Sequence, residues 1–206
     1  MDQNQTNLVP AASAENGAVV VSQPNGYEHC LELSRIYSKS GLVPQSYQDK
    51  PQDCFVAISM AQRMDLDPLF VMQNLYVVKG KPSWAGQACI ALINGCGRFK
   101  DVHHVYTGEK GTESRGCHVV ATRVSSGEVV EGPDVTLAMA KAEGWTSNSK
   151  WRNMPELMLA YRSSAFFARV YCPEALMGIQ MADEVEDVAK SDKASALTEA
   201  LKGGNE

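Results

Sequence analysis

Apolar residues recur with the period of a helix over residues 149–171, which read SKWRNMPELMLAYRSSAFFARVY. Pro155 suits the first position of a helix, because its missing N–H group needs no partner there. Cys172 precedes Pro173, and a residue before proline is disfavoured in the α-helical region, so the helix is expected to end there. The pattern predicts a short approach segment followed by one long helix with two neighbouring apolar faces.

Weaker periodic patterns predict several shorter helices. They are expected at residues 28–39, 53–64, 69–73, 85–94, 137–143 and 173–189. Asp53 and Thr136 are predicted to cap the second and fifth of these, since their side-chain oxygens can accept from free N–H groups. Gly41, Gly95 and Gly97 are expected to stop the helices that precede them.

Runs rich in β-branched and aromatic residues predict the strands. These are residues 75–79, 98–106, 117–124 and 128–131, with turns at residues 80–82, 107–111 and 125–127. Trp84 lies on the return from the first turn. Together the elements predict an α+β fold in which a small antiparallel β-sheet with a hairpin packs on the long helix.

Composition divides the chain into three parts. Residues 1–26 are rich in Asn, Gln, Ser, Ala and Gly and are predicted to be a disordered lead. Residues 27–189 are predicted to form one core, and residues 190–206 a charged, flexible tail. The polar lead does not resemble a signal peptide, and no apolar run is long enough to span a membrane, so a cytoplasmic protein is expected.

Charge is distributed unevenly along the chain. The net charge is −5, but residues 79–172 carry 12 basic and 8 acidic side chains, whereas both flanking parts are acidic. Such a chain would bind a polyanion through one local groove rather than through its overall field.

The basic middle supplies the candidate DNA-binding residues. Arg162 and Arg169 are two helical turns apart and share a stripe, and arginine forks match phosphate oxygens while aromatic faces stack on bases. The full candidate set is Lys79, Lys81, Trp84, Lys100, Lys110, Lys150, Trp151, Arg152, Tyr161, Arg162 and Arg169. The alternative for the long-helix segment is a solvated basic face, with Trp151 and Tyr161 in the core.

Motifs of bond-making chemistry are missing from the sequence. It contains no GxxxxGK[ST] phosphate loop, no GxSxG and no acidic cluster of nuclease type, so nucleotide hydrolysis and catalysis in general are not expected. A metal site from Cys96, His104 and His118 is conceivable but less favoured than ordinary strand residues. The six cysteines form no CxxC pair and are predicted to be reduced.

Two long blocks resemble a known family. The run SKWRNMPELMLAYRSSAFFARVYCPEALMG and the earlier run MAQRMDLDPLFVMQNLYVVKGKPSWAGQACIALINGCGRFKD are similar to the signature segments of the RecT/Redβ superfamily of phage single-strand annealing proteins. The resemblance covers about residues 50 to 188. It implies a phage or prophage protein in a bacterial host, and an oligomeric ring or helical filament. It also implies binding of single-stranded DNA and of the annealed duplex without ATP, with magnesium only as a DNA counterion.

The resemblance also implies roles for particular residues. Arg162 and Arg169 match basic positions that contact the DNA backbone, and Lys79 or Lys81 lies near a basic position of the hairpin region. Glu156 falls where Redβ has a basic residue, so that contact is expected to be absent. Replacing both arginines by alanine is expected to abolish annealing and leave the fold intact.

Family members often continue into a C-terminal domain that recruits a cognate exonuclease or the host single-strand-binding protein. Here about 17 residues follow the last predicted helix, so such recruitment would have to use the acidic tail. A different function remains open, namely a single-stranded DNA-binding protein that protects strands without annealing them.

Overall fold

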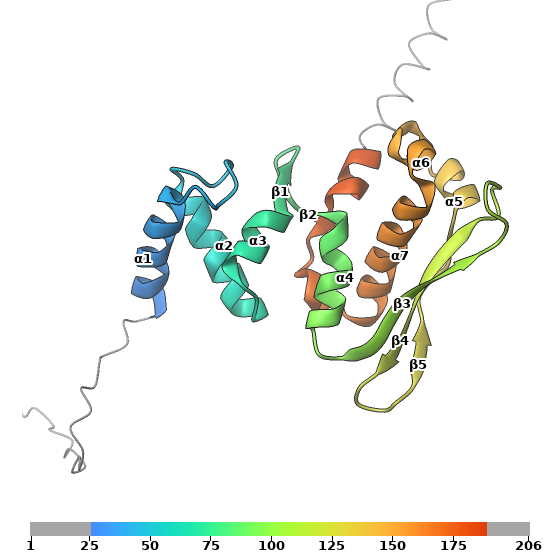
Figure 1. Ribbon diagram of the computed structural model, residues 1–206, viewed down its shortest axis with the longest axis horizontal. Coiled ribbons are helices and arrows are strands. Elements are labelled where there is room, and N and C mark those ends of the chain that lie inside the picture. Colours follow the sequence, from blue (N-terminus) through green and yellow to red (C-terminus); the bar gives the residue numbers. More distant parts are fainter. Residues whose placement is uncertain (1–25, 189–206) are drawn as a thin grey trace, which may run out of the picture.

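The computed structural model describes residues 26–188 of the chain and has an α+β fold with small, mainly antiparallel sheets (Figure 1). Three helices form one end of the molecule: α1 (Gly26–Lys39), α2 (Pro51–Met64) and α3 (Pro68–Asn74). Asp67 caps α3, its side chain accepting from the backbone N–H groups of Leu69 at 2.7 Å and Phe70 at 3.3 Å. The predicted cap of α2 is wrong, because that helix begins at Pro51 and Asp53 lies in its first turn.

A small three-stranded sheet joins this helical end to the rest of the chain. β1 (Leu75–Val78) pairs antiparallel with β2 (Lys81–Trp84), and β2 pairs in parallel with β7 (Gln180–Met181). Lys79 and Gly80 form the turn, with φ angles of 50° and 77°. The turn predicted at residues 80–82 is therefore displaced by one residue, and Lys81 and Pro82 belong to β2.

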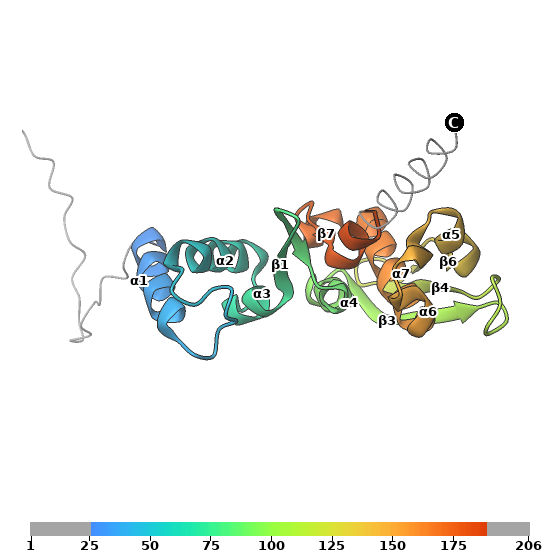
Figure 2. The ribbon, with the colours of Figure 1, turned by 90° about the horizontal axis from the view of Figure 1, so that it is seen from above.

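The predicted hairpin and its third strand are present in a second sheet. β3 (Phe99–Thr107) pairs with β4 (Gly116–Arg123), which also pairs with β5 (Val129–Glu131) and with β6 (Val135–Thr136). All these pairs are antiparallel. The long helix packs along β4, as Figures 1 and 2 show from two directions.

The long helix, α7 (Pro155–Tyr171), is the centre of the larger half of the fold. It starts at Pro155 and ends before Cys172, which confirms both signals read from the sequence. Around it lie α4 (Gly86–Gly95), α5 (Leu137–Ala142), α6 (Lys150–Asn153) and the 3-10 turn η1 (Trp145–Ser147). Thr136 caps α5 as predicted, accepting from the N–H group of Met139 at 3.1 Å.

The helix predicted at residues 173–189 is wrong for residues 173–181. The chain instead forms the 3-10 turn η2 (Pro173–Leu176) and then strand β7. Met177 and Gly178 both have positive φ angles, which no α-helix accommodates. A helix begins only at residue 182 and continues to residue 188, the end of the described part. The lead at residues 1–26, except for Gly26 in α1, and the tail at residues 190–206 lie outside the described residues.

Two observations bear on the compartment and redox predictions. All six cysteines are free thiols, as expected. Within residues 26–188, no helix is long and apolar enough to cross a membrane.

The start of α4 packs unusually closely against α7. A Cβ atom on Gly86 would lie 2.4 Å from Oδ2 of Asp183 and 2.6 Å from the ring of Tyr161. Gly86→Ala is therefore expected to lower the free energy of unfolding by about 1–3 kcal/mol, as overpacked sites do.

Gly95, at the other end of α4, is the matched control, because a Cβ atom there meets nothing within 4 Å. Gly95→Ala should leave stability unchanged or raise it by up to about 1 kcal/mol, since alanine favours the helix. Urea unfolding of both variants measures the difference, and equal midpoints would contradict the close packing at Gly86.

Candidate nucleic-acid interface

A groove of about 500 Å³ lies between the β1–β2 hairpin and α7. It brings together four basic residues predicted from sequence, two from the hairpin and two from the long helix. Its lining residues are Lys79, Lys81, Trp145, Arg162, Phe166, Arg169, Gln180, Glu184, Val185 and Val188. The long helix and the lysine turn are therefore neighbours, as the interface predicted from sequence requires.

The hairpin supplies the open charges of this groove. Lys79 and Lys81 are exposed, and neither forms an ion pair with any residue of the described part. A two-residue turn with two positive φ angles favours Asn-Gly or Gly-Gly. Lys79, at the first position of this turn, is therefore not a residue that the backbone conformation favours.

Arg169 faces the groove but already has an acidic partner. Its side chain is 40% exposed and forms an ion pair with the carboxylate of Glu184. The same carboxylate accepts from the backbone N–H group of Met181 at 3.1 Å, which fixes its position at the end of β7. Arg169 is therefore accessible, yet its charge is partly neutralised.

Arg162 is not a phosphate ligand in this structure, contrary to the expectation from sequence. Its side chain is 6% exposed and pairs with the buried carboxylate of Asp187, with Glu184 at 3.8 Å. The guanidinium also lies 3.9 Å from the ring centre of Trp145. A cation enclosed in this way supports the fold and has no open side for DNA.

Asp187 explains why Trp151 is also buried. Its carboxylate accepts from the amide of Asn148 and the indole N–H of Trp151, both at 2.9 Å, and from Arg162. Trp151 is 2% exposed, and Trp84, whose indole donates to the carbonyl of Leu176 at 3.2 Å, is fully buried. Neither tryptophan can stack on a base here, so both predictions are corrected.

Acidic neighbours engage two further candidate lysines. Lys150 contacts Asp183 at 3.2 Å and Glu186 at 3.3 Å. Burial lowers the pKa of Lys150, but its hydrogen bonds to these carboxylates outweigh burial and raise the pKa above its ordinary value. Lys110 lies 3.3 Å from Glu156.

Glu156 joins the tip of the β3–β4 hairpin to the start of α7, because it contacts Arg115 at 2.7 Å as well as Lys110. Hydrogen bonds from Arg115 and Lys110 hold the pKa of Glu156 below its ordinary value. Glu156 thus has a local role as the partner of two cations.

The remaining candidates lie outside the groove lining. Lys100 on β3 and Arg152 on α6 are exposed and form no ion pair among the described residues. Tyr161 is half-buried, with its ring beside Gly86. The sequence could not separate these side chains from the groove residues, because all of them belong to the same basic stretch.

The conceivable metal site does not form. His104 contacts Oγ of Ser164 at 2.8 Å and the carbonyl of Ala160 at 3.2 Å, and burial lowers its pKa below the ordinary value. His118 lies 3.4 Å from a carboxylate oxygen of Asp134. Over residues 26–188, no three His, Cys, Asp or Glu side chains are placed to hold a metal ion.

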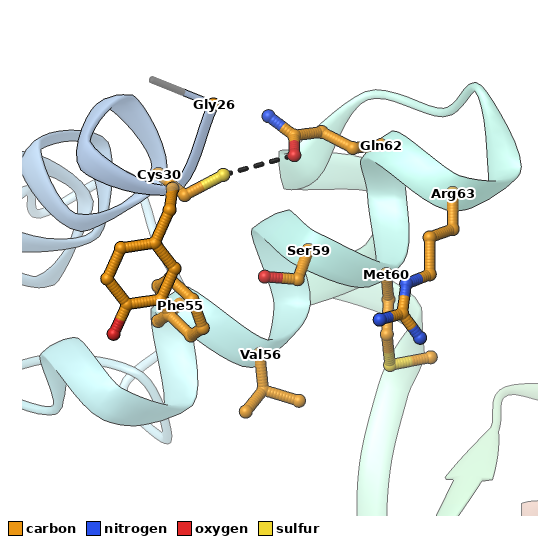
Figure 3. Close-up of a pocket in the computed structure, with 9 residues that line it drawn as sticks. Gly26, Cys30, Phe55, Val56, Ser59, Met60, Gln62 and Arg63 are labelled. Carbon is orange, nitrogen blue, oxygen red and sulfur yellow. Dashed lines mark hydrogen bonds between the residues drawn. The ribbon is translucent and has the colours of Figure 1, made fainter. Parts of the chain in front are cut away.

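A second concavity, of about 660 Å³, lies between α1 and α2 and was missed from sequence (Figure 3). Its walls are largely apolar, with Tyr27, Phe55 and Val56 on them and Arg63 as the cation. Cys30 donates to the side-chain oxygen of Gln62 at 3.0 Å within it. This concavity has one cation in its lining, whereas the groove beside α7 has two lysines without an acidic partner in the described part.

No family model, no curated protein and no solved structure matches this chain. The resemblance to the annealing proteins therefore stays a prediction from the two sequence blocks.

The Arg162–Asp187 pair gives a direct test of the buried network. Arg162→Ala is expected to lower the free energy of unfolding by about 3–5 kcal/mol, because it leaves a buried carboxylate without its cation. This prediction replaces the expectation from sequence that the double arginine variant keeps its fold.

Arg152→Ala is the control, since it removes an exposed arginine from the neighbouring helix and should change stability by no more than about 0.5 kcal/mol. Urea unfolding followed by circular dichroism measures both variants. Equal stabilities would show that Arg162 is not part of a buried network.

Proposed function

We propose that this chain binds single-stranded DNA along the groove between the β1–β2 hairpin and α7, and anneals it to a complementary strand without ATP. The observation that carries the proposal is the convergence of Lys79, Lys81 and Arg169, which come from distant parts of the sequence, on one groove. The resemblance of two sequence blocks to single-strand annealing proteins is the reason for proposing DNA as the ligand of this groove.

Electrostatics supplies the mechanism. Two complementary strands repel each other through their phosphates, and cationic side chains that neutralise phosphates release counterions and reduce that repulsion. Lys79 and Lys81 are the groove cations free of ion pairs within the described part. Annealing makes and breaks only non-covalent contacts, so it needs no catalytic side chain.

Oligomerisation would extend one short groove into a continuous binding track. A single groove with few phosphate contacts binds weakly, whereas many copies on one strand gain from effective concentration. We therefore propose a homo-oligomer, ring or filament, as the annealing species. A cognate exonuclease and the host single-strand-binding protein are its proposed partners.

A protein that only protects single strands is the second candidate, and the same groove would serve it. The two functions differ in their effect on pairing. An annealing protein accelerates the pairing of two complementary labelled oligonucleotides in the absence of ATP, whereas a protecting protein slows it.

The variant that tests the groove is Lys79→Asn combined with Lys81→Gln. Asparagine tolerates the positive φ angle at the turn, so the hairpin should be kept while two charges are lost. We expect weaker binding of a labelled single strand, slower pairing, and a fall of about 1.4 in the slope of log affinity against log salt, at about 0.7 per phosphate contact.

Arg35→Gln combined with Lys50→Gln is the matched control. It removes the same charge from exposed sites at the α1–α2 end, where no ion pair within residues 26–188 involves either residue. Equal loss of binding in both double variants would mean that only the net charge of the protein matters, and would refute the groove as the DNA-binding site.

A further inference from the structure

Outside the groove lining, one face of β1 carries an exposed aromatic ring, Tyr76, near Lys81. In the β1–β2 register, Tyr76 lies opposite Ser83, and Val78 lies opposite Lys81. Residues two apart on a strand, and residues directly opposite on its partner, project from the same face of the sheet. Tyr76 and Lys81 are therefore diagonal neighbours on one face, roughly 7–8 Å apart.

The ring of Tyr76 is both accessible and held in place. The residue is 45% exposed, and its hydroxyl donates to the carbonyl oxygen of Gln73 at 3.0 Å. Within residues 26–188, no other aromatic ring and no guanidinium packs on it. A fixed ring with an open side suits planar ligands, because little conformational freedom is lost on binding.

Two other exposed tyrosines do not offer this arrangement. Tyr27 packs edge-on against Phe55 at the α1–α2 end of the molecule. Tyr106 carries the guanidinium of Arg115 at 4.9 Å from its ring centre, and its hydroxyl donates to the carbonyl of Glu156. Of the three, Tyr76 is the one beside the lysine turn.

We propose that Tyr76 stacks against an unpaired base of the strand whose phosphates lie on Lys79 and Lys81. This inference rests on the proposed function and names its ligand more narrowly, as a single strand with accessible bases. A base inside a duplex is already stacked on both sides, so the contact with Tyr76 favours the unpaired strand. It also takes the role that the sequence assigned to the buried tryptophans.

The test compares two labelled strands of equal length and charge, a thymidine oligonucleotide and an abasic deoxyribose-phosphate strand. Stacking on an aromatic ring predicts that Tyr76→Ala weakens binding of the thymidine strand by about 5- to 150-fold. Binding of the abasic strand should not change. Tyr76→Phe keeps the ring and loses only its hydrogen bond to Gln73, so it should bind the thymidine strand more tightly than Tyr76→Ala and the abasic strand like the unmodified protein.

Tyr27→Ala is the control, because it removes an exposed tyrosine at the far end of the chain and should affect neither strand. Equal losses for both strands in Tyr76→Ala, or no loss for either, would overturn the stacking role while leaving DNA binding intact. If the unmodified protein binds neither strand, the proposed function itself fails, and the stacking role fails with it.

Discussion

The buried carboxylate of Asp187 is the constraint on which the larger half of the fold depends. A carboxylate withdrawn from water is costly unless donors replace the lost hydration. Here three donors from the chain do so, from Asn148, Trp151 and Arg162. Asn148 precedes α6, Trp151 lies in α6 and Arg162 lies in α7. The carboxylate of Asp187 therefore fixes the helix at residues 182–188 against both α6 and α7. Asp183, on the same helix, forms an ion pair with Lys150 and packs closely against Gly86 at the start of α4.

This attachment determines which cations remain open. The acids at positions 183–187 neutralise Lys150 and Arg162 and hold Arg169 through Glu184. In the groove, the charge without an acidic partner in the described part therefore lies mainly on the lysines of the β1–β2 turn. A chain of net charge −5 can thus leave Lys79 and Lys81 without acidic partners in the described part, because the acids nearest the groove pair with Lys150, Arg162 and Arg169 instead. If the chain binds DNA as proposed, the β1–β2 hairpin rather than the long helix would supply the main attraction for phosphates.

Sequence patterns predicted the elements whose signals are local. Pro155, the Cys172-Pro173 step and Thr136 each act through the backbone of the next few residues, and all three mark element boundaries correctly. The helix predicted at residues 173–189 was wrong over residues 173–181, because hydrophobic spacing does not report the backbone angles of Met177 and Gly178. Arg162 could not be assigned from sequence, since an arginine on an amphipathic face looks the same exposed or buried. Its partner lies 25 residues further along the chain, and only the packed structure brings the two together.

The pairing of Arg169 with Glu184 also affects how the groove would respond to salt. A lysine without an acidic partner carries mobile counterions in solution, and these are released when a phosphate replaces them. Arg169 carries instead a carboxylate that belongs to the chain, so a phosphate that engages it exchanges one ion pair for another. Such an exchange gains little entropy, and the freed Glu184 must be solvated or keep its bond to the Met181 N–H group. Under the proposed function, the affinity of the groove for DNA and its salt dependence would therefore come chiefly from Lys79 and Lys81, and Arg169 would position a phosphate rather than attract it.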